Sequence, residues 1–253
     1  MSSSHDRRDF FKRSALAGAA LALGGKEAMA QADPKPELIK LSGPGVKADP
    51  RKALIKLLEP LGGMKAFVKK GQTVMLKPNM GFATPPDRRA TTDPRLVAAA
   101  AQEAIKAGAG KVLIVDHPMR NPDACRRLNG IEAACKGLDV HLLLPMDGQY
   151  YVDKNSAGAK VLKKTKVIKD ALAADVHIAM PVAKSHMAAG FSGGIKGLMG
   201  LVLDRESFHS RFDLNQAIAD LASLIKTDLS IMDALSVMAS GGPAGPGELI
   251  ERN

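Results

Sequence analysis

The hydrophobic positions along the chain fall into short apolar runs separated by longer amphipathic segments. The short runs are typical of buried strands, and they lie at residues 73–78, 111–116, 140–144, 176–180 and 229–233. The longer segments predict helices at residues 50–58, 93–106, 131–136 and 214–225. A strand, a helix and a second strand follow one another within about 44 residues, a spacing that requires a parallel pair. The pattern therefore predicts an α/β fold, with an open, mainly parallel twisted sheet and helices on both faces.

The first 30 residues have the order of features found in a twin-arginine export signal. Two arginines at positions 7 and 8 precede aromatic and basic residues, an apolar run and the sequence AMA at positions 28–30. The apolar run has about a dozen residues, against the roughly 20 that span a bilayer. We expect cleavage after Ala30 and a periplasmic or exported protein without a transmembrane span. An amphipathic N-terminal helix or a retained membrane anchor is the alternative.

Without this signal, the chain divides into an N-terminal wrap and helix at residues 31–70 and the α/β domain at residues 71–253. The whole chain has a formal net charge of +10, and the first 30 residues hold five basic and three acidic side chains, so the remainder carries +8. This excess favours small anionic ligands. Nucleic acid is not expected as a partner, because aromatic residues make up only 4% of the chain and Trp is absent.

The two cysteines, Cys125 and Cys135, lack the repeated spacing of an iron–sulfur or zinc site. One continuous helix would keep them apart, whereas a break at Asn129-Gly130 would let them form a disulfide. The sequence therefore leaves two alternatives open for this pair: a disulfide or two buried thiols. The sequence predicts no iron–sulfur cluster in this chain.

Polar side chains follow three of the predicted strands, at the point where each strand ends. Lys77 lies at the end of the first strand and Asn79 directly after it, His117 follows the second, and Lys184 and His186 follow the fourth. In an open α/β sheet, ligands bind in the crevice outside the carboxyl ends of the strands. We therefore expect these side chains to share one crevice.

Five glycines fall within residues 190–200, beside Lys196. Glycine lets the backbone approach a ligand closely, and a lysine adds a positive charge for phosphate or carboxylate. We expect Gly193, Gly194 and Lys196 to contact a ligand or cofactor; a flexible lid is the alternative. The spacing is not that of a Walker loop, and no strand is expected directly before the segment, as a dinucleotide-binding loop would require.

Two further patterns have structural interpretations. Residues 160–169 carry five lysines and predict an exposed edge strand, which its charges protect against pairing with another chain. A surface for an anionic partner is the alternative. His141 and His177 lie inside apolar strands and are expected to be packed or to face an edge.

A set of motifs in this order resembles the family catalogued as domain of unknown function 362, from about residue 70 to residue 248. The motifs are LKPNM at 76–80, ATTDP at 90–94, VLIVDHP at 112–118, MPVAKSH at 180–186 and GFSGGIKGLMG at 190–200. Members of that family occur alone or joined to ferredoxin-type iron–sulfur modules. They usually continue past the Gly/Pro-rich loop at the end of this chain, so the resemblance implies a truncated or minimal form.

A shorter resemblance links SHMAAGFSGGIK, residues 185–196, to the nickel-pincer lactate racemases. It implies acid/base roles for His186 and His117, attachment of the pincer nucleotide at Lys196, and nickel ligation by His209. A soft metal in a sulfur-bearing cofactor suits an imidazole ligand, and racemisation needs a proton acceptor on each face of the substrate. The chain departs from those racemases at residues 77–79, where they carry an Asp-x-Thr-Arg turn.

These observations together predict a cofactor- or metal-dependent enzyme that acts on a small anionic, hydroxy-acid-like substrate. Lys77, Asn79 and Lys184 join the glycine segment as expected cofactor contacts. Within that segment, a non-covalent anion contact is the favoured role of Lys196. The alternative function is a periplasmic binding or electron-transfer accessory protein that works with an iron–sulfur redox partner.

Overall fold

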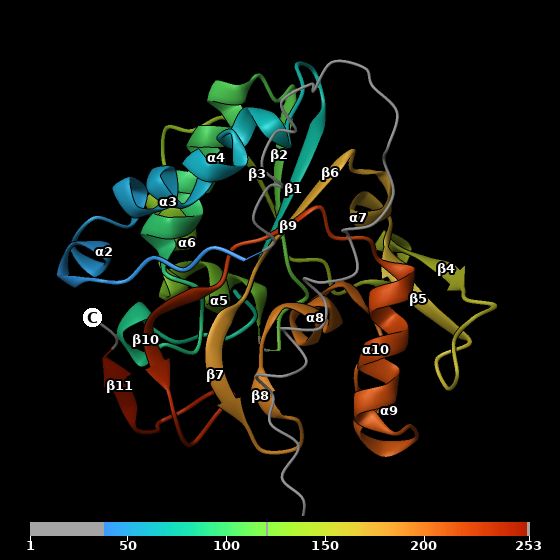
Figure 1. Cartoon of the computed structure of the whole chain (residues 1–253). Coiled ribbons are helices and arrows are strands. Elements are labelled where there is room, and N and C mark those ends of the chain that lie inside the picture. Colours follow the sequence, from blue (N-terminus) through green and yellow to red (C-terminus); the bar gives the residue numbers. More distant parts are fainter. Residues whose placement is uncertain (1–37, 120, 252–253) are drawn as a thin grey trace, which may run out of the picture. The chain divides into compact units, whose positions relative to one another are not determined.

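The computed structural model describes residues 38–119 and 121–251, and its main sheet is parallel throughout (Figure 1). Its five strands lie in the order β3 (His141–Leu143), β2 (Lys111–Val115), β1 (Thr73–Pro78), β6 (Val176–Met180) and β9 (Leu229–Ser230). Every neighbouring pair is parallel. The predicted parallel α/β sheet is therefore confirmed.

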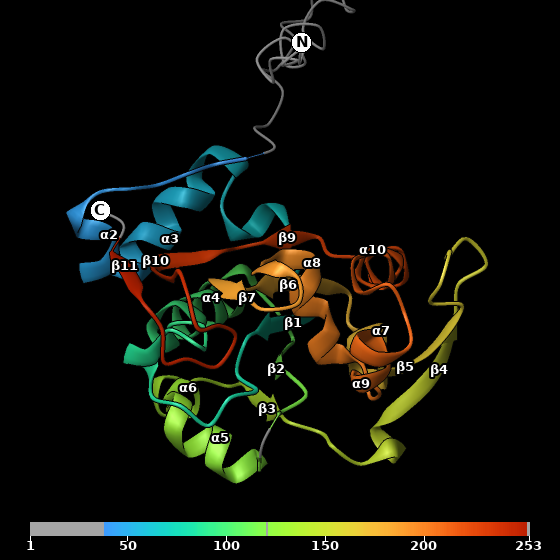
Figure 2. The same cartoon turned by 90° about the horizontal axis from the view of Figure 1, so that it is seen from below.

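Helices cover both faces of this sheet. Alternate residues of a strand point to opposite faces, so Val74 and Leu76 of β1 lie in one apolar core and Met75 in another. The first core includes α3 (Pro50–Leu58), α4 (Pro94–Ala107) and α6 (Ile131–Ala134), whereas the second includes α9 (Glu206–Ser210) and α10 (Leu214–Leu224). Figure 2 shows α5 (Pro122–Asn129) and α6 to the left of β1–β3, with α9 and α10 to the right. Each fully buried aliphatic side chain contributes about 1.5–3 kcal/mol to this packing.

A second sheet, which the hydrophobic pattern did not predict, continues directly from the first. It has the order β11 (Leu249–Glu251), β10 (Asp233–Met238), β7 (Val182–His186) and β8 (Gly190–Ser192). Pro181 separates β6 from β7, because proline has no N–H to continue the ladder. The predicted strand at 229–233 is corrected in the same way: β9 ends at Ser230, and Asp233 begins β10 in the second sheet.

The lysine-rich segment forms a two-stranded antiparallel ribbon. In it, β4 (Tyr151–Asn155) pairs with β5 (Lys164–Ile168). Thr165 and Val167 are buried while Lys164 and Lys166 are exposed. On its other side β5 makes only an isolated bridge, between Val167 and Val202, which agrees in large part with the expected charged edge strand at 160–169.

The segment ATTDP joins the ends of several strands. Thr92 Oγ1 accepts a hydrogen bond from Asn79 N after β1 at 2.9 Å and donates one to Met180 O at the end of β6 at 2.7 Å. The next residue, Asp93, caps α4 through Arg95 N at 2.9 Å, and its own N–H donates to Asp233 Oδ2 at 2.7 Å. This segment therefore connects both sheets and α4.

Cys125 and Cys135 are buried thiols, and the Sγ of Cys125 donates to Gly81 O at 3.4 Å. The sequence left open a disulfide or two buried thiols, and the structure has two buried thiols. His177 is buried, with Nδ1 2.9 Å from Lys226 O, and His141 is exposed on the edge strand β3. Both histidines therefore lie where the apolar pattern placed them.

The proposed export signal lies in residues 1–30, outside the described part of the chain, and stays a prediction. The described residues lie in the second of two units of the chain, Pro36–Asn253. In the second unit, α2 (Pro44–Ala48) and α3 precede the main sheet, and α7 (Lys169–Ala173) follows β5. No helix among residues 38–119 and 121–251 is long and apolar enough to cross a bilayer.

Two adjacent buried threonines allow a matched test of the ATTDP segment. Thr92→Val leaves Asn79 N without an acceptor, so we expect the free energy of unfolding to fall by about 1–3 kcal/mol. Thr91 is equally buried, but its hydroxyl has no hydrogen-bond partner among the described residues, so Thr91→Val is expected to be neutral or stabilising. Urea denaturation measures both values, and equal losses in the two variants would contradict this assignment.

Candidate functional site

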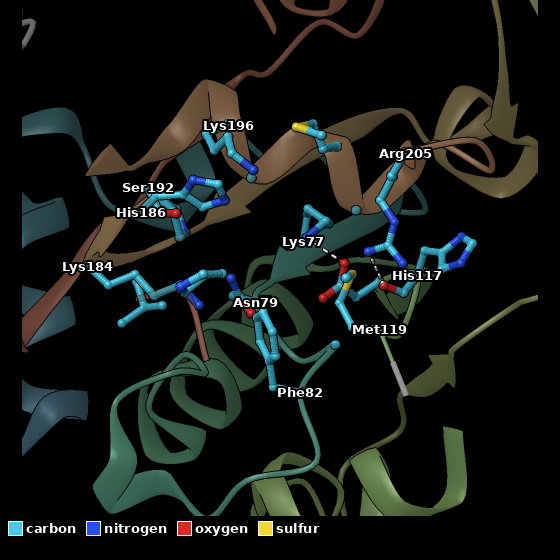
Figure 3. Close-up of a pocket in the computed structure, with 18 of the residues that line it drawn as sticks. Lys77, Asn79, Phe82, His117, Met119, Lys184, His186, Ser192, Lys196 and Arg205 are labelled. Carbon is cyan, nitrogen blue, oxygen red and sulfur yellow. Dashed lines mark hydrogen bonds and ion pairs between the residues drawn. The ribbon is translucent and has the colours of Figure 1, made fainter. Parts of the chain in front are cut away.

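A cavity of about 580 Å³ lies at the carboxyl ends of β1 and β2, under β7 and the glycine segment (Figure 3). All but one of the site residues predicted from the sequence line it: Lys77, Asn79, His117, Lys184, His186, Gly193, Lys196 and His209. The exception is Gly194, where a Cβ atom would lie 3.3 Å from Ser230 Oγ. The structure therefore places the expected residues around one crevice. Lys184 and His186 reach it from β7 in the second sheet and not from a loop after the fourth strand.

A buried ion pair forms the floor of this cavity. Lys77 Nζ lies 2.9 Å from Asp116 Oδ1, and the two side chains are only 3% and 5% exposed. Lys77 Nζ also donates to Pro78 O at 2.7 Å, and Asp116 Oδ2 accepts from Met80 N at 2.8 Å. Two of the three lysine N–H groups are thus used inside the protein. The charge of Lys77 is therefore balanced before any ligand arrives.

Two glycines make room for this ion pair. A Cβ atom at Gly200 would lie 2.0 Å from Asp116 Oδ1 and 2.8 Å from Lys77 Nζ. A Cβ atom at Gly81 would lie 3.3 Å from Asp116 Oδ2. The last glycine of the glycine segment is therefore needed for a close approach to the ion pair and not to a ligand.

Lys184 is fully buried, and its ammonium group has no carboxylate partner among the described residues. It donates to Ala90 O and lies 4.4 Å from the centre of the Phe82 ring. With the Asn79 amide oriented so that its oxygen faces this ammonium, the oxygen lies 3.1 Å from Lys184 Nζ. Burial lowers the pKa of Lys184 to about 7, and the charges of Lys196 and Lys77 act in the same direction, while Asp116 opposes them.

Lys196 lies on α8 (Gly194–Gly197) and is partly buried. Its amine has no hydrogen-bond or ion-pair partner among residues 38–119 and 121–251. Burial lowers its pKa to about 8, and the positive charges of Arg205 and Lys77 add to this shift. Among the lysines that line the cavity, this one keeps all three N–H groups available.

The hydrogen bonds of His186 decide which of its ring nitrogens carries the proton. Ala188 N and Ala189 N both donate to His186 Nδ1 at 3.2 Å, so the neutral ring carries its proton on Nε2. Burial lowers the pKa of His186 to about 4, with further lowering by Lys196, His209 and Lys184. The neutral ring is therefore a hydrogen-bond donor at Nε2.

His209 stacks on His186, with ring centres 5.8 Å apart and planes 10° from parallel. Burial and the charge of Lys196 lower the pKa of His209, although the residue as a whole is exposed. The structure thus brings Lys196, His186 and His209 together. The nickel-ligating role of His209 stays a prediction.

His117 is the predicted site residue whose ring lies apart from the others. Tyr151 Oη lies 2.7 Å from His117 Nδ1, and Figure 3 shows the imidazole on the far side of Arg205 from Lys196 and His186. Burial and the charge of Arg205 lower the pKa of His117 to about 4. The catalytic role of His117 stays a prediction, and this orientation does not support it.

Arg205 is a cavity residue that sequence reasoning did not identify. It donates from Nη1 to His117 O at 3.0 Å and from Nη2 to Pro118 O at 2.9 Å. It has no carboxylate partner among the described residues, and burial lowers its pKa. Arg205 lies in an irregular segment between the glycine segment and α9, where neither periodicity nor a recurring motif indicated it. The only signal in the sequence is a positive charge close after the glycines.

The geometry does not fit the paired acid/base histidines that the racemase resemblance implies. His186 presents a proton and not a lone pair at Nε2, and the His117 ring lies beyond Arg205. In the described part of the chain, no group of three or more His, Cys, Asp or Glu side chains could hold a metal ion. We therefore derive no catalytic step through a nickel-pincer nucleotide.

The glycine segment also corrects one sequence expectation, because a strand, β8, lies directly before its Gly193-Gly194 pair. β7 and β8 form a hairpin that turns at residues 187–189, and Gly190 has the positive φ of +71° that favours glycine. α8 follows β8 after Gly193 alone. The segment is therefore part of the ordered cavity wall, which does not support the alternative of a flexible lid.

Comparison with known proteins gives several matches. The thylakoid-associated protein sll1697 of Synechocystis sp. is 33% identical over 199 residues, which are 76% of this chain and 60% of that protein. This chain thus spans less than two thirds of that relative. Among solved structures, a Thermotoga maritima protein matches with a TM-score of 0.48 and 15% identity, covering 85% of this chain and 55% of that one.

The apoprotein of lactate racemase from Thermoanaerobacterium thermosaccharolyticum matches with a TM-score of 0.47 and 16% identity, covering 76% of this chain and 48% of that one. At these scores, neither structural match carries an argument about the site. The family model described as "Domain of unknown function (DUF362)" matches residues 74–252, which include the main sheet from the second residue of β1 onward and the whole glycine segment. This chain therefore belongs to the DUF362 family.

Proposed function

We propose that this chain binds a small anionic ligand in the cavity at the carboxyl ends of β1 and β2, with Lys196 as the main contact. The observation that carries this proposal is the Lys196 amine, which has no partner among the described residues in a cavity already rich in cations. An ammonium group with three unused N–H donors is a strong point contact for phosphate, sulfate or carboxylate.

The balance of charge around the cavity supports the same conclusion. Asp116 is paired with Lys77, whereas Lys184 and Arg205 donate only to carbonyl or amide oxygens and to a ring. Two further acidic residues line the cavity, Asp204 and Glu206, and both are exposed. The inner wall therefore has an excess of positive charge that a bound anion would offset, at an effective dielectric well below that of water.

A small hydroxy acid is the substrate class that we propose for an enzyme at this site. Residues 185–196 resemble the racemase loop, and the His186 Nε2–H lies beside Lys196, where it would donate to a bound carboxylate. The alternative, an accessory role beside an iron–sulfur redox partner, has no supporting feature in the described part of the chain.

We also propose that the protein functions outside the cytoplasm after twin-arginine export. This rests on the order of features in residues 1–30 alone.

Removal of the Lys196 amine provides the first test. With sulfate as the probe at pH 6.5 and low ionic strength, Lys196→Ala is expected to weaken binding by about 10- to 100-fold, because it removes one charge-assisted contact. Lys196→Arg keeps the charge and should retain part of the affinity. Lys154→Ala, which removes an exposed lysine on β4, is the control for net charge. Isothermal titration calorimetry measures all four proteins, with lactate as a second probe. Unchanged sulfate binding by Lys196→Ala would exclude Lys196 as the main anion contact.

The lowered pKa values predict how anion affinity depends on pH. An anion favours the charged amine and raises its pKa in the complex, so affinity is full below the pKa of the unliganded protein and falls above it. Sulfate affinity should therefore fall as pH rises through about 7 for Lys184 and about 8 for Lys196, not near 10.5. In Lys196→Arg the step near pH 8 should disappear, since guanidinium stays charged. A wild-type affinity that stays constant to pH 9.5 would contradict both assignments.

Export has its own test in the native host. We expect intact-mass analysis of the envelope fraction to show a chain that begins at Gln31. An Arg7→Lys/Arg8→Lys variant should remain in the cytoplasm as the uncleaved precursor, while a Lys12→Arg variant, which keeps the pair, should be exported normally. Export of the double variant at the wild-type rate would exclude the twin-arginine route.

A further inference from the structure

The cavity offers unused hydrogen-bond donors at two separate places. Lys77 and Lys184 each make internal contacts on at least two sides of the ammonium group. Lys196, by contrast, has all three N–H groups available, and the Nε2–H of His186 lies beside it. Arg205 uses two of its five N–H groups on the carbonyl oxygens of residues 117 and 118, which leaves three.

These two donor groups lie at opposite ends of the site. Figure 3 shows Lys196 and His186 on one side, Arg205 on the other, and Lys77 between them. The charge of Lys77 is already balanced by Asp116 at 2.9 Å. The cavity therefore has two positively charged ends, named here the Lys196 end and the Arg205 end, and a centre that is close to neutral.

The size and lining of the cavity also indicate more than one small ion. Its volume of about 580 Å³ falls in the range of about 300–1,000 Å³ that is typical of sites for drug-sized ligands. Apolar side chains of Val182, Met199 and Leu203 line it together with the charged groups. A single sulfate or lactate would meet one charged end and leave the other, and the apolar lining, without a partner.

We infer that the cavity takes an elongated ligand with an anionic group at each end, one bound at the Lys196 end and the other at the Arg205 end. The chemical class is a dicarboxylate, a bisphosphate or a phosphorylated carboxylate with a short carbon body. This inference rests on the proposed function, because the Lys196 end is the same anion site, and it adds Arg205 as a second subsite. Asp204 lies near that end, but its carboxylate accepts from Ser207 N at 3.1 Å and Ser207 Oγ at 2.6 Å, and it forms no ion pair with Arg205.

Sulfonates test this inference, because they stay fully ionised across the working pH range. The probes are propanesulfonate, with one charge, and the 1,2-ethane-, 1,3-propane- and 1,4-butanedisulfonates, titrated calorimetrically into the full-length protein. The best disulfonate is expected to bind at least about tenfold tighter than propanesulfonate, with a maximum at one chain length. If the positive charge of the cavity merely attracted any doubly charged ion, the affinity would not peak at one chain length.

Variants at each end separate the two subsites. Lys196→Gln should abolish the gain of disulfonate over propanesulfonate, and Arg205→Gln should do the same, while Lys154→Gln on β4 should preserve it. Since Arg205 also holds the turn at residues 117–118, Arg205→Lys is measured beside Arg205→Gln, and thermal midpoints show which variants are folded. If both Arg205 variants are unfolded, the Lys196→Gln result and the chain-length profile decide.

The two possible failures are distinguishable. Propanesulfonate and all three disulfonates binding within threefold of one another would overturn the second subsite and leave the single-anion function in place. Binding of none of the probes, nor of sulfate, would overturn both proposals. A disulfonate gain that survives in Lys196→Gln would place the paired charges elsewhere and would also overturn the inference.

Discussion

The ion pair between Lys77 and Asp116 is the constraint on which the site depends. Both side chains are almost fully buried, and loss of one partner from such a pair typically costs about 3–5 kcal/mol, because a buried charge is left unbalanced. The pair joins the carboxyl ends of β1 and β2, and it fixes the turn after β1 through the bond from Met80 N to Asp116 Oδ2. Since no side chain fits above it, the segment that crosses it must carry glycine at position 200.

This pairing determines which cations remain available to a ligand. The carboxylate of Asp116 is used by Lys77, so Lys184, Lys196 and Arg205 share a cavity without a buried carboxylate of their own. Burial lowers the pKa values of all three, and for Lys184 and Lys196 the neighbouring positive charges lower the pKa further. Unpaired buried cations of this kind carry an electrostatic cost, which the anion proposed above would reduce. Burial and the charge of Lys196 also lower the pKa values of His186 and His209.

The second sheet is what brings the parts of the site together. Pro181 ends β6, and the chain then enters β7, which presents Lys184 and His186 to the cavity from above the strand ends. The chain also passes from the main sheet to the second sheet between β9 and β10. Asp233 begins β10, and its carboxylate accepts a hydrogen bond from Asp93 N at the start of α4. Thr92 closes the junction between β1 and β6. Segments that are more than a hundred residues apart therefore form one wall because a few buried polar groups hold the two sheets in register.

The sequence by itself determined the parallel sheet, most of its strands and the two-sided helix cover, because these follow from the local alternation of apolar and polar residues. It also determined that Lys77, Asn79, Lys184 and His186 share a crevice, since the carboxyl ends of parallel strands meet at one edge. Only the tertiary structure decided the second sheet, the direction of the His117 ring, the role of Gly200 and the place of Arg205. Each of these depends on contacts between residues far apart in the chain: an ion pair that excludes a Cβ atom, a tyrosine that holds a ring, and carbonyl groups that orient a guanidinium. Periodicity in a sequence records which face of an element is buried, but it does not record which element will cover that face.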